Sequence, residues 1–128
     1  MNKEQREYIK AQAELAAAEE QERKLEAEFL KKRGYDVASI YCIEDESEFD
    51  RLNEEFAAEP EEKKVWDRVC KARDKKLEAE EKLIQYALSI IPMKKEREIL
   101  SKAAKTNWKA RQEMLSIVMK LDTKTVRA

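Results

Sequence analysis

The residues best suited to chemistry lie in the last third of the chain, where lysines and a tryptophan recur at helical spacing. Lys102, Lys105 and Lys109 fall on one face of an expected helix, and Trp108 borders that face. Ammonium groups spaced along a helix can follow the phosphates of a nucleic acid, and an indole can stack on a base. We therefore take Lys95, Lys102, Lys105, Lys109 and Trp108 as candidate nucleic-acid or phosphate contacts.

The same lysines also fit an ordinary solvated helix face. Glu98 and Glu113 interrupt them, and Trp108 would then anchor the edge of the core instead of stacking on a base. The charge distribution is nevertheless uneven, since residues 92–128 carry a net charge of +6 and residues 34–59 carry −8. This polarity matters more for the choice of partners than the total charge of −1.

The acidic segment supplies a second candidate surface, this time for a protein partner. Its densest part comprises Glu44, Asp45, Glu46, Glu48 and Asp50. Such a run can attract a basic protein or imitate the backbone of a nucleic acid. It lacks the glycine and the ligand spacing of a calcium loop, so it predicts no metal site. The alternatives are a solvated acidic surface, or neutralisation of the basic helix in the same molecule or in a symmetric partner.

Composition argues against the common catalytic and cofactor sites. The chain has no histidine, which removes the commonest general base and zinc ligand, and a single glycine cannot build a phosphate-binding loop. Two cysteines, Cys42 and Cys70, are no disulfide framework and have no histidine to activate them. We expect both to be reduced structural thiols, and we predict no catalytic residue, no metal, no cofactor and no enzymatic activity.

The elements that position these residues are expected to be helices. One glycine, two prolines and 43% charged residues argue against an all-β protein and favour long helices. We predict an all-α fold, an elongated antiparallel bundle of three long helices over residues 2–33, 60–91 and 93–121. The acidic connection 34–59 should hold one or two short helices, and residues 122–128 should form a frayed tail. One domain is expected at this length.

Residues that typically begin or end helices support these boundaries. Asn2 can cap the first helix and Gly34 can end it. Pro60 suits a first helical turn, while Pro92 must end or kink the second helix because proline has no N–H to donate. A tight junction at Pro92 makes the second and third helices antiparallel. The direction of the first helix stays open, and we prefer an up-down-up arrangement.

The acidic connection is the least determined stretch. Asp45 or Ser47 is expected to cap a short helix whose Phe49, Leu52 and Phe56 lie against the long helices. The apolar run over residues 37–43 is compatible with a further short helix or with extended chain, because a short apolar run does not distinguish them.

Polar residues interrupt the apolar stripes of all three long helices. If the first two helices are antiparallel and level, Glu22 comes near Arg73, and folding back at Pro92 brings Lys76 near Asn107. A buried charge is costly unless it is paired, so one shared layer that fixes the helix register is favoured over scattered burial. The alternative is that these side chains extend to solvent at a loosely packed waist.

Together these patterns predict a non-enzymatic interaction protein that acts through charged helical surfaces, with a protein partner. Nucleic acid bound by the third helix is one alternative. Another is an anti-CRISPR-like inhibitor of a nucleoprotein complex, of the kind that phages and mobile elements carry, using the acidic segment. The alanine-rich stripe of the first helix also allows a homo-oligomer. No apolar run reaches transmembrane length and the first 33 residues are too charged for a signal peptide, so we expect a cytoplasmic protein without a membrane partner.

Overall fold

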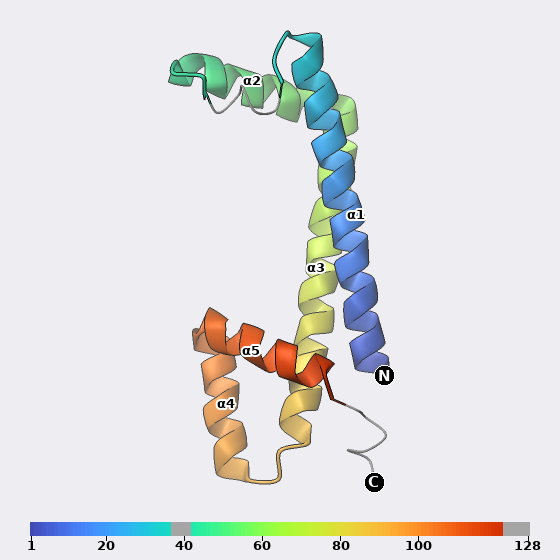
Figure 1. Cartoon of the computed structure of the whole chain (residues 1–128), viewed down its shortest axis with the longest axis vertical. Coiled ribbons are helices and arrows are strands. Elements are labelled where there is room, and N and C mark those ends of the chain that lie inside the picture. The colour runs from blue at the N-terminus through green and yellow to red at the C-terminus, as the bar shows by residue number, and fades with distance from the viewer. Residues whose placement is uncertain (37–41, 122–128) are drawn as a thin grey trace. The chain divides into compact units, whose positions relative to one another are not determined.

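The computed structural model describes residues 1–36 and 42–121, and these residues form five helices and no strand. The helices are α1 (Lys3–Lys32), α2 (Glu46–Ala58), α3 (Pro60–Ser89), α4 (Lys94–Thr106) and α5 (Trp108–Met119) (Figure 1). The all-α class is therefore confirmed, as is the packing of the long helices α1 and α3 against each other. The predicted tail 122–128 and the open choice for residues 37–41 lie outside the described residues.

The signals at the helix ends act as expected. Asn2 and Gln5 form a reciprocal capping box: the Gln5 N–H donates to Asn2 Oδ1 at 2.8 Å, and the Asn2 N–H donates to Gln5 Oε1 at 2.9 Å. Gly34 follows α1 with φ +82°, a left-handed conformation that ends helices at little cost only when the residue is glycine. Pro60 is the first residue of α3.

The prediction of a single helix over residues 93–121 is wrong, because this segment forms two helices, α4 and α5. Asn107 adopts an extended backbone, φ −131° and ψ 106°, between α4 and α5. Its N–H still donates to Ala103 O at 2.9 Å, and its side-chain oxygen accepts the N–H of Ala110 at 3.1 Å. One asparagine thus ends α4 and caps α5. The apolar spacing resumes after Asn107 and concealed this break, although asparagine is a poor helix interior residue and a good cap.

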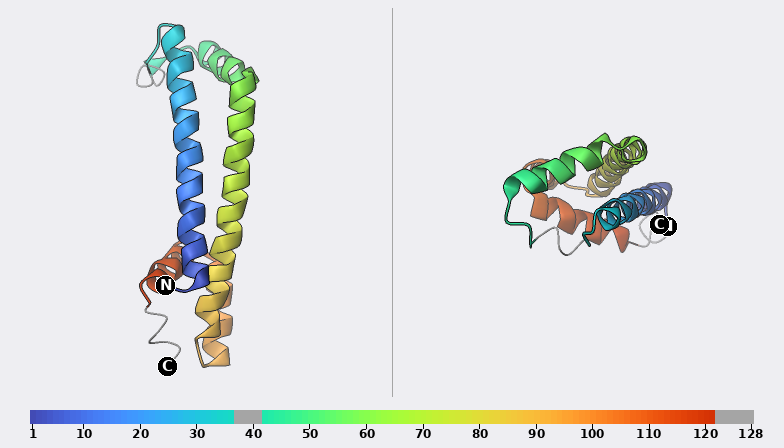
Figure 2. Two further views of the ribbon diagram at one scale, coloured as in Figure 1. Left: turned by 90° about the vertical axis from the view of Figure 1, so that its right-hand side faces the viewer. Right: turned by 90° about the horizontal axis from the view of Figure 1, so that it is seen from above.

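The chain divides into two compact units, and each is described by itself. Unit 1 comprises Met1–Gln12 and Asp74–Ala128, and unit 2 comprises Ala13–Arg73. The start of α1 meets the end of α3 in unit 1, and the end of α1 meets the start of α3 in unit 2. The two helices are therefore antiparallel, as preferred from the sequence, and they lie side by side in Figures 1 and 2.

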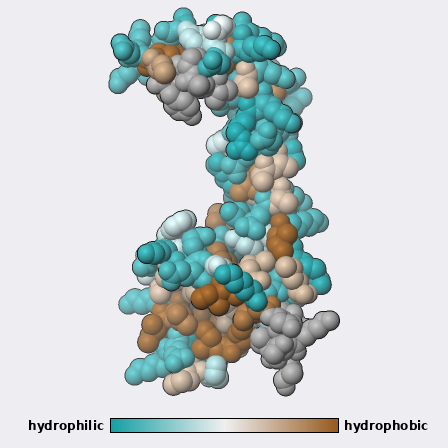
Figure 3. All heavy atoms as spheres, viewed as in Figure 1, coloured by the Kyte–Doolittle hydropathy of each residue, from teal (hydrophilic) through white to brown (hydrophobic). Residues whose placement is uncertain are grey.

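Unit 1 has one core, to which α1, α3, α4 and α5 all contribute. Its buried residues are Tyr8, Ala11, Ala79, Leu83, Ile84, Leu88, Ala104, Leu115 and Val118. Figure 3 shows apolar atoms gathered where α4, α5 and the end of α3 meet. Burial of this apolar surface is the main force that folds α4 and α5 onto α3.

A buried amide holds the first turn of α1 in unit 1. Gln5 has no exposed surface, and its side-chain nitrogen donates to Val118 O at 2.8 Å and to Leu121 O at 3.2 Å. These carbonyls lie at the end of α5 and just after it, where the last carbonyls of a helix lack the usual intrahelical donors. Val118 O also accepts the backbone N–H of Leu121 at 3.3 Å. Gln5 therefore caps α1 through its oxygen and the end of α5 through its nitrogen.

Unit 2 has two smaller cores. One lies between α1 and α3 and is made of Leu15, Ala18, Val65, Val69 and Ala72. The other holds α2 through Leu52, which packs with Phe29 and Leu30 of α1. Phe49 and Phe56 pack against the same cluster, so the predicted apolar face of this short helix is confirmed.

Replacing Gln5 with alanine should destabilise the protein, because it removes the acceptor of the buried Asn2 N–H and the side-chain donor to the Val118 and Leu121 carbonyls. We expect a loss of about 1–3 kcal/mol in the free energy of unfolding, measured by urea denaturation. Gln12 is exposed on the same helix, so Gln12→Ala should change that free energy by less than about 0.5 kcal/mol. Equal effects of the two changes would contradict the anchoring role of Gln5.

Candidate functional site

One face of α4 lines an open groove in unit 1. The α3 side of the groove is formed by Gln85 and Leu88, and its volume is about 570 Å³. The α4 side is formed by residues that recur every three or four positions, which places them on one helix face: Lys94, Arg97, Glu98, Ser101, Lys102, Lys105 and Thr106. A neighbouring face of α4 supplies Ala104 and Leu100 to the core. Core packing of one face therefore leaves the other facing the groove.

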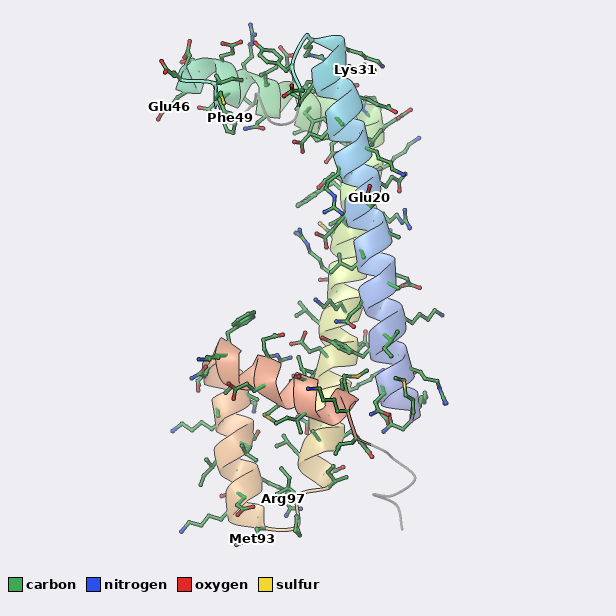
Figure 4. All side chains as sticks on the ribbon, in the orientation of Figure 1. Glu20, Lys31, Glu46, Phe49, Met93 and Arg97 are labelled. Carbon is green, nitrogen blue, oxygen red and sulfur yellow. The ribbon has the colours of Figure 1, made fainter. Side chains whose placement is uncertain are left out.

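The groove is strongly basic. Four of its lining residues are cationic, and Glu98 is its single carboxylate. None of these four cations forms a salt bridge with another described residue. Figure 4 shows Arg97 close to the beginning of α4, on the side toward the end of α3. A hydrogen bond from Gln85 is the main cause that lowers the pKa of Glu81, and Lys105 contributes to this lowering only through its charge. The groove cations are therefore not engaged in direct ion pairs and can meet an anionic ligand.

The structure keeps part of the predicted basic stripe and changes the rest. Lys102 and Lys105 line the groove, whereas Lys95 and Lys109 are exposed outside its lining. Trp108 is 75% exposed, so it does not anchor the edge of the core. Three- and four-residue spacing from Lys94 in the sequence indicates the α4 face that lines the groove. The α3 side of the groove, Gln85 and Leu88, becomes apparent only when α4 is packed against α3.

The predicted acidic surface is divided between structural and solvent-facing roles. Asp45 caps α2, its carboxylate accepting the Ser47 N–H at 2.9 Å, and Glu48 accepts a hydrogen bond from the Tyr35 hydroxyl. The other three residues, Glu44, Glu46 and Asp50, are exposed. Figure 4 shows Glu46 at the start of α2. Within residues 1–36 and 42–121, no three such side chains come together in a way that could hold a metal ion.

The residues predicted to share a polar layer have other surroundings. Arg73 is exposed, and its guanidinium lies over the Trp66 ring at 5.3 Å from the centroid. Glu22 is half-buried beside Glu62 instead of pairing with Arg73. Asn107 is the exposed cap of α5, and Lys76 is half-buried. Helix spacing gives the face on which a residue lies but not the residue that it meets, so the predicted pairing of Glu22 with Arg73 is wrong.

A buried ion pair does form, but between other residues. Glu80 is only 6% exposed, and its carboxylate accepts a hydrogen bond from Arg111 of α5, which also reaches Glu81 at 3.3 Å. Burial lowers the pKa of Arg111, but the bonds and charges of the two carboxylates outweigh it and leave the pKa raised. Burial, and then the charge of Glu80, raise the pKa of Tyr8. This cluster fixes α5 against α3 and keeps Arg111 out of the basic groove.

Glu62 is the least compensated carboxyl in unit 2. It is 6% exposed, and its Oε2 has no hydrogen-bond partner among the described residues. Burial raises its pKa to about 8, together with a hydrogen bond to Glu22 and the negative charges of Glu22 and Glu26 across the α1–α3 contact. The nearby Arg33 pairs with other carboxylates, so it does not compensate Glu62. The protonated carboxyl is the form that this site favours.

Glu62 therefore links stability to pH. The folded chain keeps a proton that the unfolded chain releases near the ordinary pKa of 4.5, so the free energy of unfolding should fall as pH rises from about 4.5 to about 8. The chain has no histidine, so few other side chains titrate in this window. Glu62→Gln should abolish most of the slope and, above pH 8, stabilise the protein by roughly 1–3 kcal/mol.

Urea denaturation across this pH range measures the effect. Glu61 is the exposed neighbour on the same helix, and Glu61→Gln should leave the slope intact. If Glu62→Gln retains the slope of the original protein, another group is responsible for it.

None of the described helices is both long and apolar enough to cross a membrane. No protein-family model matches the chain, and no curated protein or solved structure shows significant similarity to it.

Proposed function

We propose that the protein is a non-enzymatic, macromolecule-binding protein whose basic groove on α4 binds nucleic acid. The observation that carries the proposal is the set of four groove-lining cations, Lys94, Arg97, Lys102 and Lys105, that have no salt-bridge partner among the described residues. Like charges gathered on one helix face repel each other, so their arrangement is best compensated by an anionic ligand.

The spacing of the charges favours a polymer over a small anion. The groove-lining residues begin with Lys94 and end with Thr106, the two ends of α4. A helix of this length extends for about 20 Å at about 1.5 Å per residue. A phosphate backbone offers negative charges at repeated intervals along such a distance, whereas a single small anion reaches only neighbouring cations.

The second candidate function is binding of a basic protein by the acidic residues at and near the start of α2. This is the protein-binding role expected from the sequence. Its support is the exposure of Glu44, Glu46 and Asp50, whose side chains form no hydrogen bond or salt bridge with another described residue, in contrast to Asp45 and Glu48. Exposed charges of one sign accelerate the encounter with a partner of opposite charge. The α4 groove is preferred because its four cations lie along one open groove between α3 and α4.

The double variant Lys102→Gln and Lys105→Gln should weaken nucleic-acid binding and make it less sensitive to salt. Each lost phosphate contact removes about one unit from the slope of log affinity against log salt, so we expect the slope to fall by about two units. Fluorescence anisotropy with a labelled oligonucleotide at several salt concentrations measures both quantities.

The matched control is Lys95→Gln with Lys109→Gln, which removes the same charge from exposed positions outside the groove. A much smaller effect is expected for this pair. Equal losses in the two double variants would show that total charge, and not the groove, determines binding. Absence of binding by the unmodified protein at low salt would overturn the proposal.

A further inference from the structure

We infer that the groove accepts single-stranded nucleic acid and that Trp108 stacks on one of its bases at the end of α4. This inference rests on the proposed function and specifies the ligand of the same site. Thr106 is the last groove-lining residue of α4, Asn107 ends that helix, and Trp108 is the first residue of α5. The indole therefore follows the basic face by two residues, where a bound backbone leaves the groove.

The exposure of Trp108 has no structural explanation within the described residues. The side chain is 75% exposed, the highest value among the large apolar residues in those ranges. With the residues of those ranges it forms no aromatic pair or cation–π contact, whereas the guanidinium of Arg73 lies over the Trp66 ring. Burying an indole is strongly favourable, and so a chain that leaves one in water forgoes that stabilisation. Base stacking would bury its face in the complex.

The helix break fixes the backbone that carries the indole before a ligand arrives. Asn107 keeps two hydrogen bonds, to Ala103 O and from the Ala110 N–H, that fix the backbone on both sides of Trp108. The start of α5 is further held because Arg111, one turn later, is bonded to Glu80. A stacking residue on a rigid element loses little conformational freedom on binding, which favours affinity.

An apolar protein-docking patch is the main competing explanation, and the helix geometry disfavours it. The other exposed large apolar residue of α5 is Ile117, at 64% exposure. It lies nine residues after Trp108, which is about 180° around the helix at roughly 100° per residue. The two side chains point to opposite sides of α5, so they do not form one apolar surface.

A single strand is favoured over a duplex because only the single strand exposes the faces of its bases. In a duplex the faces of the bases are stacked on one another, and only their edges lie in the grooves. In a single strand the faces are free, and proteins that bind such strands combine a positively charged groove with aromatic residues. The four groove cations and Trp108 supply these two elements in sequence along α4 and the start of α5.

The test uses the intrinsic fluorescence of Trp108. The chain has two tryptophans, so Trp66→Phe leaves Trp108 as the single emitter. Titration with a short oligothymidylate should quench this emission, while a hairpin duplex with the same number of nucleotides should bind with little quenching. Trp108→Ala should weaken binding of the single strand by about 5- to 150-fold, the usual effect of losing one stacked base, and leave duplex binding unchanged.

Two controls separate stacking from folding and from general apolar contact. Ile117→Ala removes an exposed apolar side chain from the same helix and should leave both affinities unchanged. Trp108→Phe keeps an aromatic ring and should retain most of the single-strand affinity. Circular dichroism melts should show that Trp108→Ala folds like the original protein, since the residue is mostly exposed.

The outcomes distinguish this inference from the proposed function. Single-strand binding without quenching, or an equal loss for both ligands in Trp108→Ala, would overturn the stacking role while the basic groove stands. Failure of the original protein to bind either ligand at low salt would overturn the proposed function and this inference together.

Discussion

The helix break at Asn107 is the constraint on which the organisation of unit 1 depends. A continuous helix from Lys94 onward would carry its last turns away from α3. Because Asn107 ends α4 and caps α5 with its own hydrogen bonds, α5 can return to α3 and bury Leu115 and Val118. Packing in this way turns one face of α4 toward the core and leaves its basic face along a groove. The same break makes Trp108 the first residue of α5, two residues after Thr106 of the groove lining.

Arg111 of unit 1 forms ion pairs whereas the groove cations form none with described residues, and the difference follows from burial. Arg111 is partly buried and has two carboxylate partners, Glu80 and Glu81. An unpaired charge at that depth would cost several kcal/mol, so pairing is required there. The cations of the groove face water, where the lack of a partner costs little. They can therefore be kept free for a ligand without destabilising the fold, which connects the packing of α4 with the proposed binding role.

Unit 2 has the opposite electrostatic character. Glu62 lies buried near Glu22 and Glu26, without a cation of its own. The acidic residues of α2 are partly occupied as a cap and a hydrogen-bond acceptor, and the rest face solvent. Burial among carboxylates makes this unit sensitive to pH, because protonation is the means by which Glu62 loses its charge. Negative charge thus disfavours ionisation of the buried Glu62, whereas the exposed acidic residues at and before α2 remain solvated.

Local signals in the sequence determined the helical class, the capping box at Asn2, the ends at Gly34, Pro60 and Pro92, and the apolar face of α2. These features depend on backbone chemistry and on spacing within one element, both of which can be read from a single chain. The break at Asn107 was hidden because the apolar spacing resumes after it. The partners of Glu22 and Arg73, the Glu80–Arg111 pair and the membership of the groove were decided by the tertiary structure. Each of these depends on which two elements meet and at what level along their axes, and a helical periodicity of about 3.6 residues carries no information about either.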